Sequence, residues 1–171
     1  MAYTLEQLAS DIHDTLKADP GIAGKQTICQ HVSKALKDDD FVTRHMPDRA
    51  PDEDPREILF EDPDLGFCIC AHVYGDAALG EPHDHGSGWA VYGQAIGTTE
   101  MIDWKIVEQG EGDKPILVEP ERTYTLVQGD AHFYDVGAVH SPKRDKPTKL
   151  LRIEGANLDN IERSNIKAMP S

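Results

Sequence analysis

A succession of short apolar runs, separated by turn residues, constrains the fold of this chain more than any other feature. From Arg56 onward the runs are EILF, FCICAHVY, WAVYGQAIG, MIDWKIV, ILVE, YTLVQ, HFYDV and KLLRIEG. Turn segments such as DPDLG, GEGDKP and QGD lie between them. Because many short strands at nearly regular spacing are typical of a β-sandwich or barrel, we predict a mainly β fold.

The first 50 residues have a helical pattern instead. Thr4 and Gln7 have the spacing of a capping box, and apolar residues then recur at helical intervals, at Leu5, Leu8, Ile12 and Leu16. After the break DPGIAG, a second helix is predicted from Ile28, Val32, Ala35 and Leu36. The segment MPDRAPDEDP is typical of a connector. We therefore expect a single domain in which a short helical segment, residues 1–50, packs on a barrel formed by residues 51–171.

The charge of the chain limits its partners. With 31 acidic and 17 basic residues, the formal net charge is −14, which repels phosphate backbones and anionic lipid. We expect no nucleic-acid partner and no membrane association, and a protein that is a monomer or a homodimer. The N-terminal sequence lacks the pattern of a signal peptide, which favours a cytoplasmic location.

The three cysteines are predicted to be reduced. Cys68 and Cys70 lie two apart in an apparent strand, where their separation is near the upper limit for a disulfide. An odd number of cysteines fits a reducing compartment. We interpret Cys29, Cys68 and Cys70 as small buried hydrophobic residues.

Two histidines two residues apart, in the segment EPHDHGSGWAVYGQAIG, suggest metal binding. If the segment is a strand, His83 and His85 project from the same face and Asp84 points the opposite way. Two imidazoles on one face can bind a single divalent metal if a third ligand comes from elsewhere. By themselves they are a weak signal, and an isolated pair of this kind is more often a pair of surface histidines in a turn.

A second segment, GDAHFYDVGAVHSP, supplies a candidate third ligand in His140. The two segments together resemble the paired motifs of the cupin superfamily. His83, His85 and Gly97 fit the first motif, although Gly80 lies too close to the histidines. Gly129, Gly137 and His140 fit the second, with Asp135 in place of its proline. The resemblance implies a cupin double-stranded β-helix in which His83, His85 and His140 bind one metal.

The first motif lacks its usual glutamate. Depending on the spacing, Ala90 or Trp89 occupies that position, and neither side chain binds a metal. In this respect the chain resembles the three-histidine thiol dioxygenases, which include cysteine dioxygenase and mercaptopropionate dioxygenase. The resemblance implies an Fe(II) enzyme whose partners are O₂ and a small-molecule substrate, with Zn, Ni or Mn as other possible metals. Because three neutral imidazoles leave a divalent metal at +2, such a site favours an anionic substrate, with a thiol carboxylate preferred.

The resemblance has one gap. Cysteine dioxygenases carry a Ser-x-His-x-Tyr pattern on a late strand, where this chain has Leu150, Arg152 and Glu154. If that strand faces the barrel interior, Arg152 could bind a substrate carboxylate through two hydrogen bonds, or it could pair with Glu154. Tyr92 follows Ala90 by two residues and is the second catalytic candidate. It could donate a hydrogen bond to bound substrate, or simply fill the core.

Other functions remain open from the sequence. Three-histidine cupins that cleave rings or diketones would need a larger apolar pocket. Cupin isomerases usually need a dedicated acid–base pair, and a non-catalytic metal- or ligand-binding barrel would need neither. His132 is predicted to be a solvated or core histidine, and Trp89 and Trp104 are predicted to pack.

Overall fold

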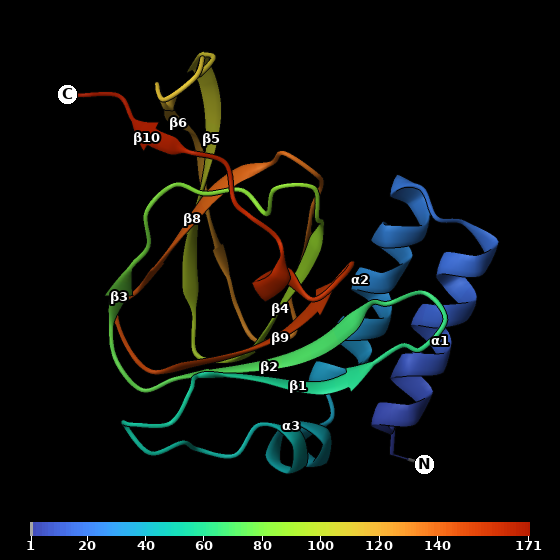
Figure 1. The fold of residues 1–171 in the computed structure, drawn as a ribbon. Helices are drawn as coiled ribbons and strands as arrows, with labels where there is room; N and C mark the ends of the chain where they lie inside the picture. Colours follow the sequence, from blue (N-terminus) through green and yellow to red (C-terminus); the bar gives the residue numbers. More distant parts are fainter. Residues whose placement is uncertain (1) are drawn as a thin grey trace.

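The computed structural model describes residues 2–171 as three N-terminal helices followed by strands that form a barrel (Figure 1). The helices are α1 (Leu5–Ala18), α2 (Ile22–Leu36) and α3 (Asp39–His45). The strands are β1 (Arg56–Glu61), β2 (Cys68–Tyr74), β3 (Ala78–Leu79), β4 (Ala90–Ile96), β5 (Thr99–Glu108), β6 (Ile116–Leu126), β7 (Ala131–Tyr134), β8 (Val139–Arg144), β9 (Thr148–Glu154) and β10 (Ile166–Ala168). None of these described helices is both long and apolar enough to cross a membrane.

The order of the strands defines the fold. Strands β5 and β6 form a hairpin, and moving outward from it β4 pairs with β7, β3 with β8, and β2 with β9. All four pairings are antiparallel, so residues 68–154 form one long two-stranded ribbon. Further ladders, β4 with β9 and β5 with β8, close the ribbon on itself into two sheets of order β1-β2-β9-β4-β7 and β10-β6-β5-β8-β3. A ribbon rolled in this way is the jelly roll, and the prediction of a cupin double-stranded β-helix is confirmed.

The helical segment covers the outer face of the first sheet, as Figure 1 shows on the side of α1 and α2. The capping box predicted for α1 is present, with the Thr4 side chain accepting from the Gln7 amide and the Gln7 side chain accepting from the Thr4 amide. Helix α2 lies against β4 at Gly93. A Cβ atom at this position would lie 2.5 Å from Val32 and 2.7 Å from Leu36, so glycine permits the close packing.

Alternate side chains of β4 and β9 pack into two different cores, one on each face of the sheet. Side chains on the outer face pack against the helices, and they include Val91 of β4 together with Leu151 and Ile153 of β9. Those on the inner face form a smaller cluster inside the barrel: Ala90, Tyr92, Met101, Leu126, Tyr134 and Leu150. Because consecutive residues of a strand point to opposite faces, the same strands serve the helix interface and the barrel interior.

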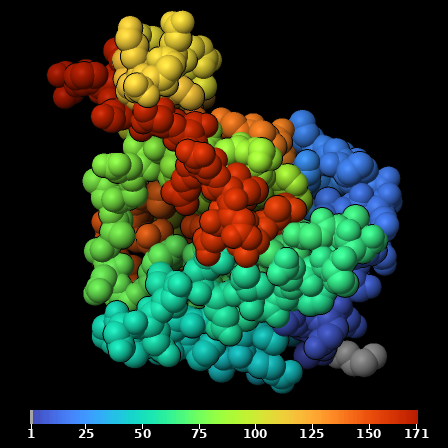
Figure 2. Space-filling view, in the orientation of Figure 1, coloured from blue at the N-terminus to red at the C-terminus, as the bar shows by residue number. Residues whose placement is uncertain are grey.

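The chain after β9 crosses the mouth of the barrel. We call residues 155–165 the C-terminal strap; in Figure 2 they lie across the face toward the viewer. Leu158 of the strap packs on the inner cluster, and the chain then continues to β10, which pairs in parallel with β6. Asp84 fastens the strap by accepting hydrogen bonds from the Ser164 amide, at 3.0 Å, and from the Ser164 hydroxyl, at 2.6 Å.

Candidate metal centre and adjoining pocket

Three histidines converge at the mouth of the barrel, near the strap. His83 and His140 face each other across an isolated β-bridge, in which each amide donates to the other carbonyl at 3.0 Å. His85 lies two residues after His83. One ring nitrogen from each of His83, His85 and His140 can be chosen so that all three lie within 4.8 Å of one another. The two segments predicted to supply metal ligands are thus brought to one place.

The local structure around the histidine pair differs from the sequence prediction. We expected both histidines in a strand, but only His83 makes a bridge, and His85 leads into a turn. Gly86 forms this turn with a φ of +58°, and a Cβ there would lie 2.1 Å from the Glu162 carbonyl oxygen of the strap. The close approach of the strap therefore replaces a regular strand with a tight loop. Asp84 nevertheless points away from the histidine rings, toward Ser164, as expected.

Backbone carbonyls fix the orientation of two of the histidine rings, and burial favours the neutral form of all three. His83 Nδ1 donates to the Glu81 carbonyl at 3.0 Å, and His140 Nδ1 donates to the Ala138 carbonyl at 3.1 Å. In both rings the Nε2 lone pair is therefore available. Burial lowers the pKa of His83 to about 4 and that of His85 to about 3, and it lowers the pKa of His140 well below its ordinary value.

The rings are thus neutral at physiological pH, which is the form that binds metals. Three neutral imidazoles, two of them with Nδ1 protons held by backbone carbonyls, suit iron, copper, nickel or zinc. The structure therefore contains a candidate divalent-metal site, and the cluster includes no carboxylate from residues 2–171. Ala90, which the motif places where cupins often have glutamate, is fully buried on the inner face of β4.

Tyr92 lies against the cluster. Its hydroxyl oxygen is 2.9 Å from His85 Nε2 and 3.1 Å from His140 Nε2, and its ring is almost completely buried. Burial raises the pKa of Tyr92, so the hydroxyl keeps its proton at neutral pH. Tyr134 stacks on the His140 ring with a centroid separation of 4.1 Å. The sequence did not indicate this second tyrosine.

Arg152 extends into the barrel interior, next to Tyr92. Its guanidinium carbon lies 4.1 Å from the centre of the Tyr92 ring. The pairing of Arg152 with Glu154 that the sequence left open does not form among the residues described. Glu154 instead accepts a hydrogen bond from Arg56 at 2.7 Å and a second from the Leu158 amide of the strap.

A pocket of about 310 Å³ adjoins the histidines. Its walls include His83, Tyr74 and three arginines: Arg144, Arg152 and Arg163. Arg144 and Arg163 were not predicted from the sequence as site residues. Arg144 could have been found, because His140, Pro142 and Arg144 alternate on β8 and share a face. Arg163 belongs to the strap, where no periodic pattern indicates its direction.

Several other predicted residues lie outside this site. His132 is half-buried and packs at a tilt against Tyr124 and Tyr134, with ring centroids 5.0 Å and 4.6 Å away, and burial lowers its pKa. Trp104 is fixed by a 2.8 Å hydrogen bond to the Ser141 hydroxyl, and Trp89 packs against Phe133.

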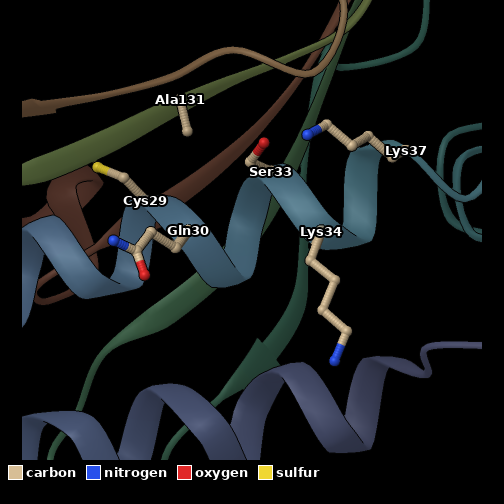
Figure 3. Close-up of a pocket in the computed structure, with 6 residues that line it drawn as sticks. All are labelled: Cys29, Gln30, Ser33, Lys34, Lys37 and Ala131. Atoms are coloured by element: carbon tan, nitrogen blue, oxygen red, sulfur yellow. The ribbon is translucent and has the colours of Figure 1, made fainter.

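A separate hollow lies on the helical side of the molecule, between α2 and β7 (Figure 3). Cys29 and Ser33 line it opposite Ala131, and Lys34 points away toward α1. None of the three histidines lines this hollow.

No protein-family model and no curated protein matches the chain. Among solved structures, the chain is similar to a conserved protein with a double-stranded β-helix domain from Klebsiella pneumoniae, with 16% identity, a TM-score of 0.48, and coverage of 72% of this chain and 93% of that one. A cupin superfamily protein from Desulfitobacterium hafniense has 12% identity and a TM-score of 0.44, over 62% of this chain and 80% of that one.

A third similar structure is the DMSP lyase of Ruegeria pomeroyi, with 15% identity and a TM-score of 0.44, over 61% of this chain and 48% of the lyase. The strand pairing and the histidine cluster together define a protein with the cupin fold and a candidate divalent-metal site.

Proposed function

We propose that this protein is a non-haem iron oxygenase that oxidises a small anionic substrate, with a thiol carboxylate as the first candidate. One observation carries the proposal: three neutral imidazoles, with no carboxylate from the described residues among them, adjoin a pocket lined by arginines. When bound, an iron ion would supply positions for O₂ and for an anionic atom of the substrate. The three histidines would leave its full charge uncompensated, which favours anions.

The chain's own residues have separate tasks in this proposal. His83, His85 and His140 hold the metal through nitrogens whose ring orientation is fixed, for two of them, by backbone carbonyls. Tyr92 keeps its proton and donates a hydrogen bond from its hydroxyl at the edge of the cluster. Arg152 binds the substrate's negative group, so the substrate is held at two points and its reacting atom is oriented.

The dimensions and polarity of the pocket favour this substrate class over ring or diketone compounds. Those would call for a larger apolar cavity, whereas the space beside His83 is about 310 Å³ and carries guanidinium groups. A specific observation supports a second candidate. The Tyr92 hydroxyl beside two imidazoles is an acid–base group that a metal-dependent isomerase or lyase could use.

The test is O₂ consumption by protein loaded anaerobically with Fe(II), measured with a panel of mercapto-acids, diketones and phenolic acids. We expect uptake with at least one mercapto-acid, and none with the zinc-loaded protein. Substrate conversion that continues under nitrogen in the zinc form would favour the isomerase or lyase. No O₂ uptake with any thiol would remove the thiol dioxygenase proposal.

A further inference from the structure

Three arginines meet in the pocket beside His83. Arg144 comes from β8, Arg152 from β9 and Arg163 from the C-terminal strap. Within residues 2–171, the ion pairs of the protein involve none of them. The pocket therefore carries a concentrated positive charge in a protein whose net charge is −14.

Two of these arginines, Arg144 and Arg152, are largely shielded from water; Arg152 is half-buried. Arg144 is only 7% exposed, and the Nε atoms of Arg144 and Arg152 are both buried without a hydrogen-bond partner among the described residues. Buried charges in proteins are normally paired, and two neighbouring guanidinium groups also repel each other. An arrangement of this kind is stabilised when an anion binds between the groups.

Aromatic rings contact the guanidinium groups of Arg144 and Arg152. Arg144 lies over the Tyr74 ring at 3.8 Å, and Arg152 lies over the Tyr92 ring at 4.1 Å. Stacking uses the face of a guanidinium group and leaves its N–H donors, which lie in the plane, available to a ligand. The contacts with the tyrosine rings therefore help to position the two groups while their N–H donors stay available.

The third arginine comes with the strap. Ser164, the next residue, is fastened to Asp84 by two hydrogen bonds, and Asp84 lies between the two histidines of the loop. Glu81 is the acidic residue at the pocket wall, but it is exposed and forms no ion pair with an arginine in the described chain. Its charge offsets the three arginines only in part.

From this arrangement we infer that the pocket binds a dianionic group, such as a phosphate, a phosphonate or a dicarboxylate, between Arg144, Arg152 and Arg163. A single carboxylate would satisfy one guanidinium fork, whereas a dianion presents enough oxygens and charge for two or three. The inference rests on the proposed function in that it specifies the substrate of the same site. The substrate would then carry this dianionic group on the side away from the histidines.

The experiment is calorimetric titration of the metal-free protein at mildly alkaline pH, with inorganic phosphate, methylphosphonate, succinate and acetate as probes. We expect phosphate and at least one other dianion to bind about tenfold or more tightly than acetate. Preference for phosphate and methylphosphonate would indicate a tetrahedral group, and preference for succinate a dicarboxylate. Equal binding of acetate and all the dianions, or no binding of any dianion, would overturn the inference.

Variants identify the site. Because Arg163 is exposed, Arg163→Gln should fold normally and weaken phosphate binding about tenfold. Arg44→Gln removes the same charge from an exposed position on α3 and should leave binding unchanged. Arg144→Lys keeps the charge but loses the planar fork, and should also weaken binding. Equal effects of Arg44→Gln and Arg163→Gln would show non-specific attraction and overturn the inference.

The two proposals can fail separately, since these titrations need neither metal nor O₂. Phosphate binding without O₂ uptake on any substrate would support the dianion pocket and overturn the proposal of an oxygenase. Rapid O₂ uptake with a monoanionic thiol, together with no dianion binding, would support the oxygenase proposal and overturn the inference of a dianion pocket.

Discussion

The two faces of strand β9 have opposite character. Leu151 and Ile153 point outward into the apolar core beneath the helices, whereas Leu150, Arg152 and Glu154 point into the barrel. The outward residues bury only hydrocarbon, and the inward set places a guanidinium group and a carboxylate in the interior. This contrast teaches that stability and ligand recognition can be assigned to alternate positions of one strand, so neighbouring substitutions should have separable effects.

The largest expected effect is on the metal. His140→Ala removes one of three ligands, and since two imidazoles hold a divalent ion much more weakly, we expect a folded protein that loses its metal and all O₂ uptake. Metal stoichiometry of the purified protein is the measurement. His132→Gln, which changes a half-buried histidine on β7 outside the cluster, is the matched control. Full metal content in His140→Ala would show that the assignment is wrong.

On the outer face, Ile153→Ala should act on stability alone. The side chain is fully buried, so its truncation should lower the free energy of unfolding by about 3 kcal/mol, through lost burial and the cavity that remains. Denaturant unfolding measures this loss. We expect the metal content of the folded variant to be unchanged. A loss of metal at full stability would contradict the separation of the two faces.

One residue earlier, Arg152→Met should act on recognition. Losing a charge-assisted contact costs about 2–3 kcal/mol, which corresponds to roughly a fiftyfold fall in kcat/KM. A mercapto-acid should show this loss, and its uncharged amide should show little. The free energy of unfolding should stay the same or rise, because an unpaired buried charge is removed. Equal losses of kcat/KM for the acid and the amide would show that Arg152 has a structural role and does not bind the carboxylate.

The smallest expected effect concerns the thiols on the two sides of the sheet. Burial raises the pKa of Cys29, on the helical side, to about 11, and that of Cys70, in β2, to about 12. At neutral pH the thiolate fraction of each is then about one part in ten thousand or less. We expect negligible alkylation of the folded protein at neutral pH, and a rate that rises as pH increases toward these values.

Cys29 should react before Cys70 because it is half-buried rather than buried. Mass spectrometry after timed alkylation gives the order, and the denatured protein provides the control for full labelling. Fast labelling of Cys70 at neutral pH would mean that the interior of the barrel opens more readily than the structure implies.

The sequence predicted those parts of the molecule that depend on local patterns. The capping box at Thr4 and the alternating runs located helix and strands, and the order of the two histidine motifs indicated the rolled ribbon. The loop around His85 was predicted as strand because its conformation depends on the strap, which is distant in sequence.

The surroundings of the three histidines were harder to predict. The strap brings Arg163 to the pocket, and Glu154 pairs with Arg56, which is distant in sequence. No local pattern in the sequence reveals either arrangement. Arg144 was within reach of the alternation rule, since it lies four residues after His140 on one strand.

The hydrogen bonds between Asp84 and Ser164 have a consequence for the order in which the site is built during synthesis. The ribosome releases the histidine loop long before β9 and the strap, so the loop must wait for the later residues before Asp84 finds its partners. The last part of the pocket to be made is then the part that carries Arg163. A nascent chain would have its three histidines available, with the third arginine still to come.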